Sequence, residues 1–120
     1  MEQKRTEIPN SEAALLQQAL VELLKNEGRI LTRQVEEAFL NVPRHLFLPG
    51  VTLETAYSNA PVYTRKKGQE GRVQSCSSPP LIMATMLEML DVRPGMRILE
   101  IGTGTGYNAA LLAHMVGPEG

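Results

Sequence analysis

Three glycines at alternate positions, Gly102, Gly104 and Gly106, restrict the fold of this chain more than any other feature. A short aliphatic run at residues 96–101 precedes them and is typical of a strand buried in a parallel sheet. Residues 108–116 follow them and have the composition of a helix. Because glycine lacks Cβ, the loop between can take positive φ angles and let a ligand reach the backbone at the helix N-terminus. The pattern predicts a strand, a nucleotide-type binding loop and a helix.

The spacing of the glycines helps to identify the ligand. The dinucleotide fingerprint, Gly-x-Gly-x-x-Gly, requires a small residue where this chain has Tyr107. The pattern here is Glu-x-Gly-x-Gly-x-Gly, and its carboxylate, Glu100, suits a ligand with a cationic end better than a pyrophosphate. A tight turn from strand to helix with no ligand is the alternative.

This stretch resembles the first motif of class I S-adenosylmethionine-dependent methyltransferases. The resemblance implies that S-adenosyl-L-methionine is the cofactor and that the loop packs against its methionine and ribose parts. The cofactor-binding residues that it implies are Glu100, Gly102, Thr103, Gly104 and Gly106.

Composition and charge restrict the partners. The 120 residues are 42% hydrophobic and 21% charged, with 12 basic and 13 acidic residues and a formal net charge of -1. This balance does not favour nucleic-acid binding, and the basic cluster at residues 65–67 is interpreted as a solvated loop. The single cysteine, Cys76, and the two histidines lack the spacing of a metal site, so no metal is expected. We expect a cytoplasmic protein that does not enter the membrane.

A second motif, Val-Pro-Arg-His-Leu-Phe, lies far from the glycine loop at residues 42–47. It closely resembles a stretch near the start of protein-L-isoaspartate O-methyltransferases, and Ala56, Tyr57 and Pro61 follow in the order that this family shows. Together with the glycine loop, the resemblance extends over about residues 35–120. It implies methyl transfer to the carboxylate of an L-isoaspartyl residue in a peptide or protein, as in protein repair.

The resemblance also implies an acceptor-binding residue. The family has a serine two residues before a proline, and Ser78 matches this register, with Pro80 two positions and Gly102 24 positions further on. The implied catalytic role of Ser78 is to orient the acceptor carboxylate through a hydrogen bond. A serine followed by proline is also typical of a helix N-cap, and both interpretations remain open.

The acceptor side departs from the family. Pro61 and Ser78 are 17 positions apart, whereas most of the family joins them by a shorter stretch that contains Gly-x-Gly-Gln-Thr-Ile-Ser. Isoaspartyl repair is the first expectation, and carboxylate methylation of a dedicated natural-product precursor peptide is the alternative. A non-catalytic binding module that retains the glycine loop is a further alternative. Tyr107 makes a nicotinamide-dependent oxidoreductase the weakest reading.

Apolar spacing predicts two helices before residue 43. The first begins at Asn10 or Ser11 and ends at Gly28, and the second follows Thr32 and ends before Pro43. The apolar stripe predicted for the first consists of Leu15, Leu16, Ala19, Leu20, Leu23 and Leu24, with Gln17 on the polar face. The stripe predicted for the second consists of Val35, Ala38 and Phe39. In the next segment, Leu46, Phe47 and Leu48 are expected to anchor a loop to the core.

The remaining pattern predicts an extended segment and a long loop over residues 62–78, and then a helix through about Asp91. We therefore expect an α/β chain in which an N-terminal helical subdomain leads into the first strand and helix of a Rossmann-like, doubly wound methyltransferase sheet. The expected divisions are residues 1–50 for the helical subdomain, 51–78 for the extended segment and acceptor-side loop, and 79–120 for the start of the cofactor-binding domain.

Residues 96–101 are the one convincing sheet strand, so the sheet is expected to be incomplete. In this fold an acidic residue that binds the ribose hydroxyls ends the next strand, about 20 residues after the glycine loop. A central strand without neighbours also exposes backbone donors and acceptors to another chain. We expect the 120 residues to be inactive or weakly active by themselves and to be completed by a longer parent chain, a partner or self-association.

Overall fold

The computed structural model describes residues 11–67 and 72–120. The helices are α1 (Glu12–Asn26), α2 (Arg33–Asn41), the 3-10 helix η1 (Arg44–Phe47), α3 (Leu53–Ala56), α4 (Pro80–Leu90) and α5 (Tyr107–Val116), and the strands are β1 (Val62–Lys67) and β2 (Arg72–Ser77). Ser11 caps α1, since its hydroxyl accepts a hydrogen bond from Ala14 N at 3.1 Å. Asn10, the other predicted cap, lies outside the described residues.

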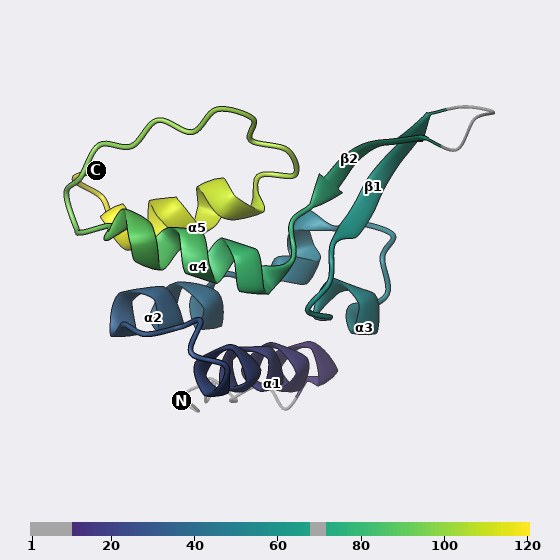
Figure 1. Cartoon of the computed structure of the whole chain (residues 1–120), viewed down its shortest axis with the longest axis horizontal. Helices are drawn as coiled ribbons and strands as arrows, with labels where there is room; N and C mark the ends of the chain where they lie inside the picture. Colours follow the sequence, from purple (N-terminus) through teal and green to yellow (C-terminus); the bar gives the residue numbers. More distant parts are fainter. Residues whose placement is uncertain (1–10, 68–71) are drawn as a thin grey trace, which may run out of the picture.

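α2 lies at the centre of the helical layers. It contacts α1, α4 and α5, and Figure 1 shows α4 and α5 above it and α1 below. Val35, Ala38 and Phe39 are buried, as the apolar spacing predicted. The ring of Phe39 meets that of Tyr107 edge to face, with centroids 6.3 Å apart. The first two helices therefore form the core on which the start of α5 rests.

α1 is rotated relative to the predicted stripe. Its buried residues are Leu20, Val21 and Leu24, whereas Leu15 and Leu23 are 55% and 40% exposed. Gln17, predicted on the polar face, turns inward instead. Its Nε2 lies 2.7, 3.0 and 3.3 Å from the carbonyl oxygens of residues 39, 40 and 42 at the end of α2. The helix was predicted correctly and Leu20 and Leu24 are buried as predicted, but Leu15 and Leu23 are not, because the polar side chain of Gln17 takes part in the packing.

The segment that contains the second motif packs differently from the prediction. Leu48 is buried and Phe47 contacts Tyr107, with ring centroids 5.7 Å apart, so these two residues anchor the segment as expected. Leu46 is 67% exposed, so its predicted anchoring is wrong. Arg44 is the buried member of η1 and has no measurable exposure.

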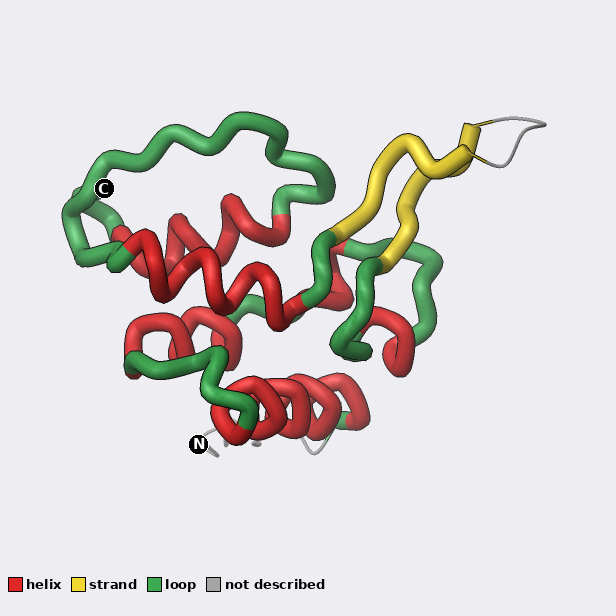
Figure 2. Tube along the Cα trace, viewed as in Figure 1, coloured by secondary structure: helices red, strands yellow, loops and turns green. Residues whose placement is uncertain are grey.

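β1 (Val62–Lys67) and β2 (Arg72–Ser77) form an antiparallel hairpin where the sequence predicted an extended segment followed by a long loop. β1 pairs with β2 from Val62 opposite Ser77 to Lys67 opposite Arg72, with irregular register between Tyr63 and Lys66. Residues 68–71, which were part of the predicted loop, lie outside the described residues. The hairpin projects from the helices, and its base leads through Ser77 directly toward α4 (Figures 1 and 2). The sequence lacks the regular alternation that identifies a strand, which is why the hairpin was missed.

Residues 96–101 do not form the predicted strand. Figure 2 shows this segment within a wide loop between α4 and α5, and no described strand lies beside it to form a ladder. Leu99 and Ile101 are 85% and 90% exposed. The two-stranded hairpin is the one sheet among the described residues, which agrees with the expected incompleteness of the Rossmann-like sheet. Within the same ranges, no helix has the length and apolar character needed to cross a membrane.

Glu88 of α4 completes the N-terminus of α2, where Thr32 makes no side-chain cap. Its carboxylate accepts hydrogen bonds from the backbone N–H groups of Leu31 and Thr32 and, at 2.7 Å, from the Thr32 hydroxyl. An acidic group at a helix N-terminus satisfies unpaired donors and interacts favourably with the helix dipole. This contact joins elements more than 50 residues apart in the sequence.

We expect Glu88→Ala to lower the free energy of unfolding by about 1–2 kcal/mol, because three donors lose a charged acceptor. Denaturant unfolding of the chain measures the change. Glu22→Ala is the matched control, since Glu22 is 65% exposed and makes one ion pair at 3.8 Å, and its effect should be much smaller. Equal losses in the two variants would contradict the assigned cap.

Candidate functional site

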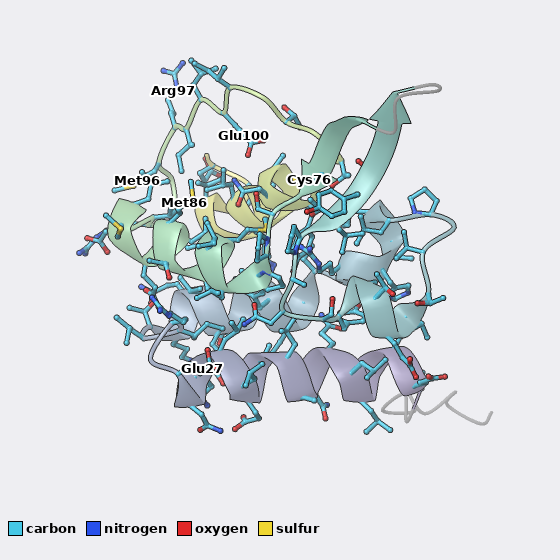
Figure 3. The ribbon with its side chains drawn as sticks, turned by 45° about the vertical axis from the view of Figure 1, so that its right-hand side comes forward. Glu27, Cys76, Met86, Met96, Arg97 and Glu100 are labelled. Carbon is cyan, nitrogen blue, oxygen red and sulfur yellow. The ribbon has the colours of Figure 1, made fainter. Side chains whose placement is uncertain are left out.

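A cleft of about 380 Å³ opens where the base of the hairpin, α4, the segment before α5 and the start of α5 meet. Its lining residues are Cys76, Ser77, Ser78, Met83, Met86, Leu90, Ile98, Leu99, Glu100, Ile101, Gly102, Thr103, Gly104, Thr105, Tyr107, Asn108 and Leu112. Figure 3 labels Cys76, Met86 and Glu100, which approach the cleft from three different segments. Five of the six predicted site residues line this one cleft, and Gly106, the cap of α5, lies in the chain between two lining residues, Thr105 and Tyr107.

The glycine loop has the backbone geometry that its sequence predicted. Gly102, Gly104 and Gly106 have φ angles of +79°, +57° and +89°, values that residues with a side chain rarely adopt. A Cβ added at Gly102 or Gly104 would meet no protein atom within 4 Å. The loop is thus bent by its glycines and leaves open space on the side of the cleft.

Among the residues that the structure describes, no side chain caps the N-terminus of α5. Gly106 occupies the cap position, and its carbonyl oxygen accepts the first helical hydrogen bond from Ala110 N at 3.0 Å. The N–H groups of the first turn of a helix have no partner within the helix, so they are available to solvent or to a ligand. The cleft therefore combines open backbone with the positive end of a helix dipole.

Glu100 carries an acceptor without a donor. Its Oε2 accepts a hydrogen bond from Asn108 Nδ2 at 2.6 Å. Its Oε1 is buried and has no partner among the described residues. A buried carboxylate oxygen without a donor is costly, at roughly 1–3 kcal/mol or more. Asn108 therefore fixes the orientation of the carboxylate, and a ligand with a hydrogen-bond donor would complete it.

Ser78 lines the cleft but does not cap α4. The helix begins at Pro80, its cap position is Pro79, and no side chain of either residue accepts a capping hydrogen bond. Asn59 takes that part, because its Oδ1 accepts from Leu81 N at 2.9 Å. The helix-cap interpretation of Ser78 is therefore wrong in this structure, and Ser78 is an exposed residue that lines the cleft.

Arg44 is the main residue near the cleft that the sequence reasoning did not select. Its Nε donates to the carbonyl oxygen of Ala56 at 2.8 Å, and its Nη2 donates to that of Ser78 at 3.0 Å. Its guanidinium lies over the ring of Tyr107, 5.0 Å from the centroid. Burial lowers the pKa of this guanidinium and raises that of the Tyr107 phenol, because both charged forms lose solvation. The motif at residues 42–47 contained the signal, but there it served only to establish the resemblance.

The other titratable groups near η1 form a polar pair. His45 Nδ1 and the Tyr57 hydroxyl lie 2.8 Å apart, and burial raises the pKa of Tyr57. Cys76 is an exposed free thiol. Within residues 11–67 and 72–120, no three His, Cys, Asp or Glu side chains come together in a way that would hold a metal.

Residues 15–120 match the model of a family described as Protein-L-isoaspartate(D-aspartate) O-methyltransferase (PCMT). A protein-L-isoaspartate O-methyltransferase of Methanopyrus kandleri is 45% identical over 101 residues, which cover 84% of this chain and 42% of the relative. One of Methanosarcina mazei is 38% identical over 119 residues, which cover 99% of this chain and 45% of the relative. The chain thus spans less than half the length of these curated relatives.

Two solved structures share the fold. A protein-L-isoaspartate O-methyltransferase superimposes with a TM-score of 0.73 at 36% identity, over 86% of this chain and 31% of that one. A Plasmodium falciparum protein described as a protein-L-isoaspartate O-methyltransferase in complex with S-adenosyl-L-homocysteine has a TM-score of 0.69 at 26% identity. That match covers 83% of this chain and 42% of the other.

Proposed function

The chain belongs to the protein-L-isoaspartate O-methyltransferase family, and we propose that its cleft forms part of the site where S-adenosyl-L-methionine donates a methyl group to an isoaspartyl carboxylate. The substrate would be a peptide or protein that carries this damaged residue, and the activity would serve protein repair. The names of the relatives support isoaspartate as the acceptor and do not favour a dedicated natural-product precursor.

The observation that carries the proposal is the buried Glu100 Oε1 beside the glycine loop, which has no hydrogen-bond partner among the described residues. Its carboxylate is held by Asn108, and the ammonium group of a methionine moiety would supply the donor that Oε1 lacks. The cleft is lined there by Gly102, Thr103 and Gly104, and the two glycines have no Cβ that would keep a ligand from the backbone. The cleft residues thus fit a ligand that is cationic at one end and must approach the main chain closely.

When bound, S-adenosyl-L-methionine supplies an electrophilic methyl group on a sulfonium centre. The residues of this chain contribute by alignment, because an acceptor carboxylate is already ionised at neutral pH and needs no general base. Ser78 can donate a hydrogen bond to one carboxylate oxygen and leave the other free to react. Met83, Met86 and Leu90 supply an apolar wall that limits access of water.

The hairpin bears on substrate choice in this proposal. It occupies the stretch between Pro61 and Ser78, where the chain departs from its family's usual sequence, and its base continues into the acceptor side of the cleft. We place the protein in the cytoplasm, which is consistent with the free Cys76 thiol. We further propose that the 120 residues have little activity alone, because the segment at 96–101 has no strand to pair with among the described residues.

Gly104→Val should abolish binding of S-adenosyl-L-homocysteine, because the added side chain would block the approach to the backbone at a positive φ angle. Titration calorimetry on the whole protein measures the affinity, with circular dichroism as the check of folding. Gly50→Val is the matched control, since Gly50 has a φ of +79° with equally open surroundings but lies outside the cleft. Unchanged affinity in a folded Gly104→Val protein would exclude this loop as the cofactor site.

Ser78→Ala should lower turnover on an isoaspartyl peptide, because one acceptor oxygen would lose its donor. The activation free energy should rise by about 1–3 kcal/mol. Cofactor affinity should hardly change. Steady-state kinetics of methyl transfer by the whole protein give the turnover number and the KM for the cofactor. The matched control is Ser58→Ala. It removes a hydroxyl that donates to the Thr55 carbonyl oxygen at 2.7 Å and that does not line the cleft, so the turnover of this variant should match that of wild type. If Ser78→Ala also matches wild type, Ser78 does not bind the acceptor.

A further inference from the structure

Arg44 contacts the cleft from behind. Its side chain is completely buried and is not part of the lining. Three of its contacts are lining residues: the carbonyl oxygen of Ser78 at 3.0 Å from Nη2, the sulfur of Met83 at 3.5 Å from Nη1, and the ring of Tyr107 at 5.0 Å from Cζ. The fourth is the carbonyl oxygen of Ala56, at 2.8 Å from Nε.

We infer that Arg44 is a positioning residue, which sets the acceptor side of the cleft at Ser78 against the cofactor side at the glycine loop. This inference rests on the proposed function, because it takes these two sides to hold the two reacting molecules. Arg44 touches neither molecule and acts through the residues that do.

The packing of the helices explains why such a bridge is needed. Both α4 and α5 line the cleft, yet α4 packs on α1 and α2, α5 packs on α2, and the two helices share few close backbone contacts with each other. Ser78 lies at the junction of the hairpin and α4, and Tyr107 follows the glycine loop. The guanidinium of Arg44 meets both, so it fixes a distance that the helix packing leaves loosely determined.

The chemistry of arginine suits this task better than that of other side chains. Its planar guanidinium donates in several fixed directions while its face lies on an aromatic ring, whereas lysine presents one compact ammonium group. A buried cation is expensive, and an apolar side chain would fill the same volume with less desolvation. Among the described residues, no carboxylate forms an ion pair with Arg44. Its partners are two carbonyl oxygens, a sulfur and a ring, all of which it orients.

The first test follows a remote reporter by NMR. Tyr57 N shares a peptide bond with the Ala56 carbonyl that Arg44 holds, and Tyr57 does not line the cleft. Titration of the labelled chain with S-adenosyl-L-homocysteine should shift the amide signals of the glycine loop, the Arg44 Nε–H signal and the Tyr57 amide signal. In Arg44→Lys the glycine shifts should remain and the Tyr57 shift should disappear. A matched control, Arg33→Lys, changes an arginine that is 84% exposed and pairs with Glu37, and it should behave as wild type.

The second test separates positioning from stability. In the whole protein, Arg44→Lys should lower kcat about 10- to 100-fold through misalignment of the reacting groups, with the cofactor KM nearly unchanged. In a double-mutant cycle, Ser78→Ala should cost less in the Arg44→Lys background than in wild type, because the two residues act together. Additive effects, or an unchanged kcat for the folded fraction, would overturn the inference.

The two proposals fail in different ways. The proposed function fails if S-adenosyl-L-homocysteine shifts no amide signal of the glycine loop and the wild-type protein transfers no methyl group to an isoaspartyl peptide. The ligand-free spectra then decide the inference: Arg44→Lys should shift amides on both sides, at residues 76–78 and 104–107, and shifts on one side alone would overturn it. If Arg44→Lys does not fold, the titration of the wild-type protein tests the inference. An Arg44 Nε–H signal that does not shift with S-adenosyl-L-homocysteine would contradict the coupling between Arg44 and the glycine loop.

Discussion

The burial of Tyr107 is the constraint on which the site depends. Its ring is 2% exposed and packs against Phe39 of α2 and Phe47 of η1, with Arg44 over its face. Because Tyr107 directly follows Gly106, this packing fixes the end of the glycine loop and the direction of α5. The same residue excluded a dinucleotide fingerprint, which requires a small side chain there for close contact between helix and sheet. The core thus uses a large aromatic residue to hold one end of a loop whose other end has no strand beside it among the described residues.

The segment before the glycine loop, residues 96–101, is largely exposed although its sequence is mostly apolar. Residues 96–101 carry the aliphatic pattern of a buried strand, yet Leu99 and Ile101 face solvent and the backbone has no ladder partner among the described residues. The glycine φ angles nevertheless have the predicted sign, since they depend on local chain chemistry and on the packing of α5. Glu100 remains oriented toward α5 through Asn108, as Figure 3 indicates by its place between the loop and that helix. Local geometry therefore persists where the sheet itself is not formed.

Local signals predicted the helices, and long-range contacts account for the errors. The spacing of Val35, Ala38 and Phe39 identified the buried face of α2 because all three are apolar. The buried face of α1 was predicted only in part, because Gln17 hydrogen-bonds to the end of α2, a contact 22 or more residues away in the sequence. The choice between the two interpretations of Ser78 also depended on a distant residue, because the side chain that accepts from the first turn of α4 is Asn59.

Sequence also brought together most of the site without showing how it is supported. Glu100, Gly102, Thr103 and Gly104 follow one another and carry a recognisable spacing, and the register to Ser78 placed the opposite wall. The hydrogen bonds of Arg44 join residues 12 to 39 positions apart and end on two carbonyl oxygens and the sulfur of Met83. Such long-range contacts cannot be read from the spacing of residues in the sequence. The hairpin that precedes Ser78 was likewise missed because its strands do not alternate in polarity.

A crystal structure with S-adenosyl-L-homocysteine bound tests the central claim most directly, namely that Glu100 and the glycine loop hold the methionine end of the cofactor. We expect S-adenosyl-L-homocysteine in the cleft, with its ammonium nitrogen about 3 Å from Glu100 Oε1 and with Gly102 and Gly104 in contact with it through their backbone. S-adenosyl-L-homocysteine bound elsewhere, or bound in the cleft with its ammonium group turned away from Glu100, would contradict this claim.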